Sequence, residues 1–235
     1  NIFDPIINEQ VMNSDHILIS IPPINGEDLV IKNFSKIIEN SNSKWVTYLS
    51  ATSVYGDHKG EWVNEDSPTK PTSYNGIERL RAENLWMNLY SNNKLPLQIF
   101  RLSGIYSNEG NILSRLKSGN VKIVNKKNHF FSRIHVEDIA NILFESLLNF
   151  KPGEVYNISD DKPATSEAVT LYGAKLLSMN IPKRIEIKDI ESEMLKNFYK
   201  DSKKVSNKKM KNFFNFELKY PTYIEGLDYI NNNFI

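Results

Sequence analysis

The segment 44–57 (KWVTYLSATSVYGD) constrains the fold of this chain more than any other. It begins as an apolar strand at 44–50 and then enters a turn that is rich in Ser and Thr and ends in Val-Tyr-Gly. In two-layered α/β proteins, such a turn brings hydroxyl groups to the carboxyl edge of a parallel sheet, where ligands bind. The segment therefore predicts a parallel sheet with a binding site at its carboxyl edge.

Further apolar runs alternate with helical patterns and extend this prediction. The helix expected at 75–90 carries Ala82, Leu85, Trp86 and Leu89 at helical spacing, which gives it one buried face. Alternation of strands and helices predicts an α/β fold whose parallel strands are joined by helical crossovers. The other expected strands lie at 15–21, 97–102 and 153–159, and the other expected helices at 26–40 and 134–150.

The remaining residues predict a smaller, mainly helical lobe for the substrate. We expect the core to comprise 1–106 and 133–160, and the lobe to comprise 107–132 and 161–235. Residues 57–73 contain prolines and Gly60, which favour a surface loop. Within the lobe, helices are expected at 165–179, 189–200 and 206–215, with an extended piece near 218–220.

No Gly-x-Gly-x-x-Gly turn, which would hold the phosphates of a dinucleotide, occurs in the chain, because its ten glycines all stand apart. Four parallel strands are also few for such a fold, and the first would lie next to the place of an amino-terminal half. We therefore expect two βα units of about 30 residues each, roughly 60 in total, to be absent from this sequence.

Composition excludes several classes of protein. The net charge of +1 gives no global reason to expect nucleic acid or an acidic membrane as partner. No apolar run approaches the length that spans a bilayer. The chain has no cysteine, which rules out disulfides and thiolate catalysis and is compatible with the cytoplasmic location that we expect. Three of the four histidines, His16, His58 and His129, are scattered without metal-ligand spacing, so no metal site is predicted.

At 49–57 (LSATSVYGD) the chain resembles the extended short-chain dehydrogenase/reductase superfamily, in which a Ser-Ser/Thr-x-x-Val-Tyr-Gly turn follows a strand. More closely, it is similar to the atypical branch of NAD-dependent epimerase/dehydratase-like proteins. This resemblance implies the carboxyl-terminal part of a Rossmann-like, doubly wound sheet, and NAD or NADP as the cofactor. Supporting segments follow in order at 19–23 (ISIPP), 60–65 (GEWVNE), 101–106 (RLSGIY), 131–140 (FSRIHVEDIA), 156–160 (YNISD), 203–207 (KKVSN) and 220–223 (YPTY).

The superfamily uses a Ser or Thr to orient the substrate, a Tyr to transfer a proton, and a Lys four residues later to lower the pKa of that Tyr. The three positions correspond to Ala51, Asn75 and Arg79 in this chain. Tyr74 lies one residue early, and its neighbour four residues on is Glu78, which would raise the pKa of a phenol. The resemblance therefore does not imply the usual Tyr–Lys chemistry here.

Hydroxyl groups and one fixed charge survive at the same turn. Thr52 and Ser53 are predicted to orient the substrate, with Tyr74 as the phenol for proton transfer; capping of the turn is the alternative for the two hydroxyls. Arg79 keeps a positive charge at the lysine position and could bind a ribose or phosphate, or else pair with Glu83 on the helix surface. The predicted cofactor contacts are Ile21, Pro22, Pro23, Ser50, Arg79, Leu102, Ser103 and Ile105.

Three residues are predicted to contact the substrate, namely Tyr55, Arg133 and His135. The alternative for Tyr55 is a place in the core or the wall of the site, and the alternative for His135 is a buried, hydrogen-bonded imidazole. The leading hypothesis is an NAD(P)-dependent epimerase/dehydratase-like or reductase-like protein for a small carbonyl or nucleotide-sugar substrate, with a homodimer considered. The alternatives are a non-catalytic dinucleotide-binding protein, which the three departures at Ala51, Asn75 and Arg79 favour, and an inactive fragment.

Overall fold

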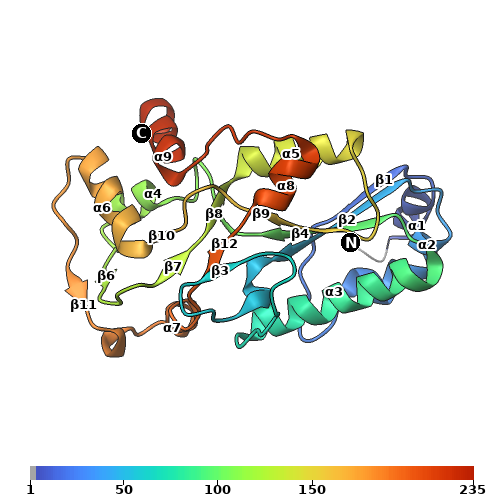
Figure 1. The fold of residues 1–235 in the computed structure, drawn as a ribbon, viewed down its shortest axis with the longest axis horizontal. Coiled ribbons are helices and arrows are strands. Elements are labelled where there is room, and N and C mark those ends of the chain that lie inside the picture. Colours follow the sequence, from blue (N-terminus) through green and yellow to red (C-terminus); the bar gives the residue numbers. More distant parts are fainter. Residues whose placement is uncertain (1–3) are drawn as a thin grey trace.

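Four parallel strands form the central sheet of the structure, a computed structural model that describes residues 4–235. The strands are β1 (His16–Ile19), β2 (Trp45–Ala51), β4 (Leu97–Leu102) and β9 (Val155–Ile158), in the order β1-β2-β4-β9. All three pairings are parallel, so the four carboxyl ends share one edge of the sheet, which faces the lobe (Figure 1). The predicted parallel α/β fold is confirmed.

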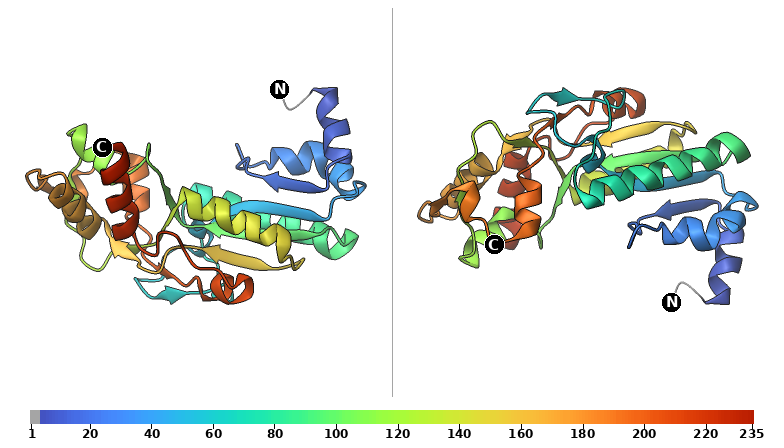
Figure 2. Two further views of the ribbon diagram at one scale, coloured as in Figure 1. Left: turned by 90° about the horizontal axis from the view of Figure 1, so that it is seen from above. Right: turned by 90° about the horizontal axis from the view of Figure 1, so that it is seen from below.

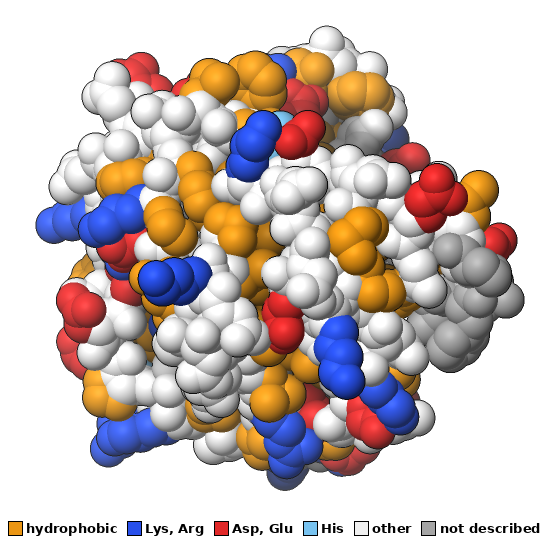
Figure 3. All heavy atoms as spheres, turned by 90° about the vertical axis from the view of Figure 1, so that its right-hand side faces the viewer, with side chains coloured by type: hydrophobic (Ala, Val, Ile, Leu, Met, Phe, Trp, Pro, Cys, Tyr) orange, Lys and Arg blue, Asp and Glu red, His pale blue; other side chains and the backbone are white. Residues whose placement is uncertain are grey.

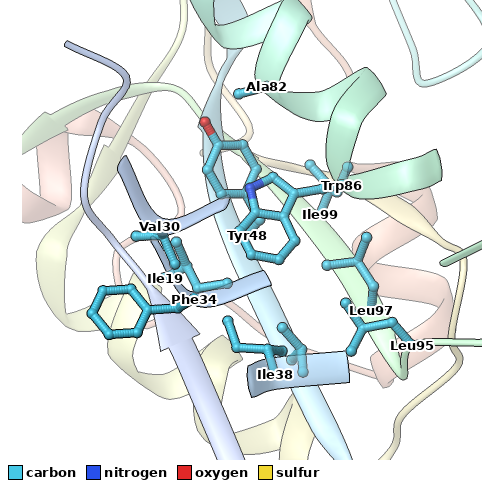
Figure 4. Close-up of a cluster of buried hydrophobic side chains, with 11 residues drawn as sticks. Ile19, Val30, Phe34, Ile38, Tyr48, Ala82, Trp86, Leu95, Leu97 and Ile99 are labelled. Atoms are coloured by element: carbon cyan, nitrogen blue, oxygen red, sulfur yellow. The ribbon is translucent and has the colours of Figure 1, made fainter. Parts of the chain in front are cut away.

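Helices cover both faces of the sheet. On one face lie α2 (Leu29–Glu39) and α3 (Tyr74–Asn93), whose apolar side chains form a core with β1, β2 and β4 (Figure 4). On the other face, α5 (Val136–Leu148) and α8 (Lys208–Phe214) pack against β4 and β9. A short helix, α1 (Pro5–Met12), precedes β1 and packs beside α2.

The lobe consists of short elements beyond the carboxyl edge of the sheet (Figures 1 and 2). Its helices are α4 (Ile112–Lys117), α6 (Ser166–Leu176), α7 (Glu193–Phe198) and α9 (Tyr223–Phe234), with a 3-10 turn η2 (Ile187–Asp189). Its strand pairs are β6 (Ile123–Val124) with β11 (Arg184–Ile185), and β7 (Phe130–Phe131) with β10 (Ala164–Thr165). The division into core and lobe stays a prediction, and α8, from the segment assigned to the lobe, lies on the sheet.

Two more strand pairs connect these parts. Strand β5 (Gly104–Tyr106) pairs with β8 (Arg133–His135), and β3 (Trp62–Val63) pairs with β12 (Lys204–Val205). The segment 57–73, predicted as a loop, therefore contains a strand, because the backbone of 203–206 offers it hydrogen-bond partners from far along the chain. The extended piece expected at 218–220 forms no strand, and the helix expected at 189–200 is shortened to α7.

One carboxylate joins the two helices on the first face. Asp28 caps the amino end of α2 by accepting hydrogen bonds from the backbone N–H groups of Val30 and Ile31, at 2.9 and 3.0 Å. Its second oxygen accepts from the indole of Trp86, which stacks on Tyr48 with ring centroids 6.0 Å apart. The helix α3, which carries the predicted site residues, is thereby held at a fixed position over β2.

A buried ion pair ties α3 to the sheet as well. Arg101 on β4 donates from Nε and Nη2 to the carboxylate of Glu83, at distances down to 2.7 Å, and both side chains are at most 8 % exposed. Its Nη1 donates to the Tyr55 hydroxyl at 2.9 Å, and that hydroxyl donates to Oδ1 of Asn157 on β9 at 2.8 Å. The polar chain Glu83–Arg101–Tyr55–Asn157 therefore spans α3, β4, the turn after β2, and β9.

A second buried charge lies where β9 enters the lobe. Asp160 is 1 % exposed, and its Oδ2 has no hydrogen-bond partner among the described residues. Burial raises the pKa of Asp160 to about 8, although the guanidinium of Arg133 acts in the opposite direction. Arg133 is itself buried, and burial lowers its pKa to about 10. The junction of sheet and lobe thus contains a buried carboxyl group whose pKa lies well above its ordinary value.

Replacing Glu83 should be far more costly than replacing an exposed partner of the same kind. Glu83→Ala leaves the Arg101 guanidinium buried and unpaired, and we expect a loss of about 3–5 kcal/mol in the free energy of unfolding. The matched control is Glu27→Ala, which breaks the exposed pair with Lys32 and should cost about 1 kcal/mol or less. Urea unfolding measures the loss in the free energy of unfolding for both variants. Equal losses would show that the buried pair matters no more to stability than the exposed one.

The raised pKa of Asp160 predicts a loss of stability as pH rises. A folded-state pKa of about 8 exceeds the unfolded value near 4, so folding favours the protonated carboxyl, and its contribution is lost between about pH 4 and pH 8. Asp160→Asn removes this titration, so the variant should lose less stability than the native protein between pH 5 and pH 9. Urea unfolding at both pH values tests this, with the exposed Asp66→Asn as control; parallel losses in native protein and variant would contradict it.

Candidate active site

The carboxyl ends of β2 and β4 present two serine hydroxyls to the edge where ligands bind in such sheets. Ser50 and Ser103 are 2 % and 4 % exposed, and neither Oγ atom has a hydrogen-bond partner among the described residues. Buried hydroxyls are normally hydrogen-bonded, so an unpartnered pair of them at this edge marks a place where a polar group of a ligand or a water fits. Both residues were predicted cofactor contacts.

The turn after β2 has a close fit to α3. Residues Thr52–Tyr55 form a 3-10 turn, η1, which ends at Gly56 with φ +68° and with the Lys70 carbonyl so close that a Cβ would overlap it. Ser73 caps α3, and a Cβ on Gly76 in its first turn would lie 2.7 Å from the Ser53 carbonyl oxygen. The two glycines thus let the hydroxyl-bearing turn lie against the amino end of α3.

Arg79 points toward the end of β2 rather than along the helix surface. Its Nη1 donates to the Leu49 carbonyl at 2.6 Å and to the Tyr48 hydroxyl at 3.3 Å. The alternative pairing of Arg79 with Glu83 is wrong, because Glu83 is bound to Arg101. Arg79 therefore places a permanent positive charge beside the last residues of β2, as its predicted cofactor role requires, and that role stays a prediction.

The structure brings the predicted catalytic residues to one place without forming a proton-transfer pair. Thr52 and Ser53 are half-buried in η1, and Tyr74 begins α3 with 59 % of its surface exposed. Asn75, at the tyrosine position of the superfamily, is exposed. Among the described residues, no Lys or His donates a hydrogen bond to the Tyr74 hydroxyl. The catalytic roles of Thr52, Ser53 and Tyr74 stay predictions.

The apolar cofactor contacts predicted from the sequence lie at the ends of β1 and β4. Ile21 is 37 % exposed, Pro22 is exposed and Pro23 is half-buried in the segment after β1. Leu102 is buried, whereas Ile105 on β5 is 55 % exposed. Apolar side chains left open at a sheet edge can cover the flat faces of a bound ring system.

The predicted substrate contacts are more deeply placed than their sequence pattern suggested. Tyr55 is fully buried, with its hydroxyl bound to Arg101 and Asn157. Arg133 stacks its guanidinium over the Phe131 ring, 3.4 Å from the centroid, and donates to the carbonyls of Phe131 and Ala164. The predicted contacts of Tyr55 and Arg133 with the substrate stay predictions.

His135 caps α5, because its Nδ1 accepts a hydrogen bond from the Glu137 N–H at 3.2 Å. This leaves the ring proton on Nε2, which is buried without a partner among the described residues, and burial lowers the pKa of His135. Asp138, in the first turn of α5, accepts hydrogen bonds from the backbone N–H groups of Lys219 and Tyr220. The predicted contact of His135 with the substrate, like that of Arg133, stays a prediction.

Sequence reasoning missed three residues around the site. Asp160 and Tyr106 were not singled out, yet both are buried with an unpartnered oxygen, and burial raises the pKa of both. Lys203 donates from Nζ to the Gly56 carbonyl at 3.0 Å, and burial lowers its pKa. Of these three residues, only Asp160 could have been noticed in the sequence, because it is an acidic residue directly after the strand expected at 153–159.

The residues that the structure describes contain neither a cluster of metal ligands nor a membrane-spanning helix. Between residues 4 and 235, no group of three or more His, Asp or Glu side chains is arranged to hold a metal ion. No helix in the same range is long and apolar enough to cross a bilayer. On the end of the molecule away from the lobe, charged side chains of both signs are interspersed with apolar ones (Figure 3).

Known structures resemble this one over most of its length. A functionally unknown conserved protein from Silicibacter pomeroyi DSS is 38 % identical, with a TM-score of 0.88 over 93 % of this chain and 77 % of that one. A dTDP-glucose 4,6-dehydratase from Bacillus anthracis in complex with NAD is 20 % identical, with a TM-score of 0.75 over 97 % of this chain and 74 % of that one. A UDP-glucuronic acid 4-epimerase from Bacillus cereus in complex with NAD is 16 % identical, with a TM-score of 0.78 over 100 % of this chain and 80 % of that one.

The two enzymes share too little sequence to establish more than the fold. No curated protein matches the chain at a significant level. The model of the NAD dependent epimerase/dehydratase family matches residues 32–159, which include β2, η1, α3, β4 and β9. This match confirms the resemblance seen in the sequence and agrees with the expected NAD or NADP cofactor. The chain belongs to the NAD dependent epimerase/dehydratase family.

Proposed function

We propose that this protein binds NAD or NADP and acts as an epimerase/dehydratase-like or reductase-like enzyme on a small carbonyl or nucleotide-sugar substrate. The observation that carries the proposal is that the hydroxyls of Ser50 and Ser103, at the carboxyl ends of β2 and β4, are buried without a partner among the described residues, while the Arg79 guanidinium lies at the end of β2. The family match and the NAD complexes of similar fold support the choice of cofactor.

A dinucleotide fits the residues at this edge. Ile21, Pro22 and Ile105 expose apolar surface that could cover its rings, while the Ser50 and Ser103 hydroxyls could bond its polar groups. Arg79 would face the ribose or a phosphate, because its guanidinium charge lies at the end of β2. The glycine-rich phosphate turn does not occur in this chain, so these residues would hold only part of the cofactor.

The bound dinucleotide would supply or accept hydride, and the residues of this chain would position the substrate. Thr52 and Ser53 can donate hydrogen bonds to a substrate carbonyl or hydroxyl, since η1 lies at the carboxyl end of β2. Tyr74 is the phenol at the same junction of η1 and α3, and it would exchange its proton through solvent because its side chain is largely exposed. Arg79 cannot take the proton, which separates this site from one with a Tyr–Lys pair.

A non-catalytic dinucleotide-binding protein is the second candidate. Ala51, Asn75 and Arg79 replace the three reactive side chains of the superfamily, and the exposed Asn75 offers no acid or base in their place. The same binding edge would then report the presence or redox state of the dinucleotide. The two candidates differ in one observable, which is whether any substrate changes the bound dinucleotide.

Dinucleotide binding should depend on Arg79. Arg79→Ala should weaken NADH or NADPH binding about tenfold, or about 1.4 kcal/mol, because a charge-assisted contact is lost. Arg81→Ala is the matched control, since Arg81 lies two residues later on α3 and pairs with Glu78 away from the β2 end. Fluorescence titration measures the affinities. An equal effect of both changes, or no binding by the native protein, would remove the cofactor role of Arg79.

Turnover should depend on the hydroxyls of η1. A Thr52→Ala/Ser53→Ala double variant should lose on the order of 10²-fold or more in kcat, with little change in dinucleotide affinity, because positioning of the substrate is lost. The assay follows nicotinamide absorbance across carbonyls and nucleotide sugars. Unchanged turnover would exclude the two hydroxyls from the mechanism, and native protein that binds the dinucleotide without turnover on any substrate would favour the non-catalytic candidate.

A further inference from the structure

A cavity lies beyond β9, at the end of the sheet's carboxyl edge opposite β1. Strand β9 is the sheet edge opposite β1, so this cavity is separated from the candidate active site at the ends of β1, β2 and β4. It has a volume of about 750 Å³, within the range of small-molecule sites. Its walls come from β3 and the turn after it, the segment after β9, and the junction of β12 with α8, and they include Trp62, Asn64, Ser67, Asn207, Lys208 and Asn212.

Hydrogen bonds fix the polar walls in place. Asn207 donates from Nδ2 to the Ser159 carbonyl and to Oδ1 of Asp161, both at 2.8 Å. Across the cavity, Oδ1 of Asn64 accepts from the Ser67 hydroxyl at 2.9 Å and from the Asp66 N–H at 3.2 Å. The β3–β12 pairing joins the two sides through the backbone. The cavity is therefore preformed, and a ligand would not have to order its walls.

One cation in the lining of the cavity is not paired with a carboxylate of the described residues. Lys211 is paired with Asp161, with Nζ and Oδ2 2.9 Å apart. Lys208, in contrast, has no carboxylate within 4 Å among residues 4–235, and it lies in the exposed first turn of α8. Asp160 also lines the cavity, but it is only 1 % exposed, whereas Lys208 is exposed. A ligand with one negative group would meet Lys208.

The remaining lining matches a ligand with hydroxyl groups and one apolar face. Trp62 is 56 % exposed, and its indole can cover the apolar face of a sugar ring. Ser67 and Asn212 supply a hydroxyl and an amide, which together donate and accept hydrogen bonds as sugar hydroxyls do. A purely apolar ligand would offer no partner to Asn212 and Lys208, and a simple anion would leave Trp62 uncovered.

We propose that this cavity binds a monosaccharide that carries one negatively charged group, such as a hexose phosphate or a hexuronate, at a site separate from the candidate active site. The sugar ring lies against Trp62, its hydroxyls bond Ser67 and Asn212, and its charged group meets Lys208. The proposal does not depend on the function proposed above, because none of these residues belongs to the dinucleotide edge.

Tryptophan fluorescence offers a direct test, because Trp45 and Trp86 are 5 % and 0 % exposed and Trp62 is the tryptophan that faces solvent. We would titrate the native protein with glucose 1-phosphate, glucuronate, glucose and inorganic phosphate, each to about 20 mM, far above a Kd of about 1 mM. A saturable change is expected with the first two, at least tenfold weaker with glucose or inorganic phosphate. The first two ligands distinguish a phosphate from a carboxylate as the charged group.

Variants then locate the site. Lys208→Ala should weaken binding of the anionic sugar about tenfold, whereas Lys117→Ala, an exposed lysine on α4 outside the cavity, should leave it unchanged. Calorimetry on Trp62→Ala should show loss of binding without relying on the fluorescence of the residue removed. Arg79→Ala should bind as the native protein does, which separates this site from the active-site edge.

Several results would overturn the proposal. They are the absence of a saturable signal with either anionic sugar, binding of inorganic phosphate as tight as that of glucose 1-phosphate, and affinities that Lys208→Ala leaves unchanged. Loss of binding in Arg79→Ala would place the sugar at the candidate active site and would equally exclude the cavity beyond β9.

Discussion

The buried chain Glu83–Arg101–Tyr55–Asn157 is the interaction on which the rest of the structure depends. It crosses the sheet at the carboxyl edge and fixes the distance between α3, β4, η1 and β9. Burying an ion pair costs desolvation energy, which the remaining hydrogen bonds must offset. Here each charged group finds several partners, because Arg101 donates to both Glu83 oxygens and to Tyr55. These hydrogen bonds therefore fix the relative positions of the four elements more than they stabilise the fold. An apolar cluster could fill the same space, but it would not set the orientation of η1.

The sequence predicted the sheet because each strand and helix carries its own local signal. Apolar runs of strand length and the face of Ala82, Leu85, Trp86 and Leu89 are visible without knowledge of the fold, although Leu85 proves 41 % exposed. Strand β3 and the hydrogen bonds of Lys203 were missed because their partners lie about 140 residues away. Nothing within 57–73 or 200–206 indicates that the two segments pair, so a proline-containing stretch looked like a loop.

The candidate site was predictable in its place and much less in its details. Parallel strands share one edge, so Ser50, Thr52 and Ser103 had to lie near one another wherever the helices went. The partner of Arg79 could not be read from its spacing to Glu83, because the choice between helix surface and sheet depends on Arg101, which binds Glu83 from another element. The unusual state of Asp160 depends on the lobe that covers it and has no local signature.

The departures at Ala51, Asn75 and Arg79 have a physical consequence beyond the loss of a proton relay. A lysine at position 79 could approach a ribose and exchange protons. The Arg79 guanidinium, in contrast, already donates a hydrogen bond from Nη1 to the Leu49 carbonyl. It therefore fixes the end of β2 while keeping other N–H groups for a ligand, since a guanidinium has five donors. The substitution thus exchanges a titratable group for a rigid one. A site built in this way favours binding and orientation, and any proton that its chemistry needs would come from the exposed Tyr74 phenol or from solvent.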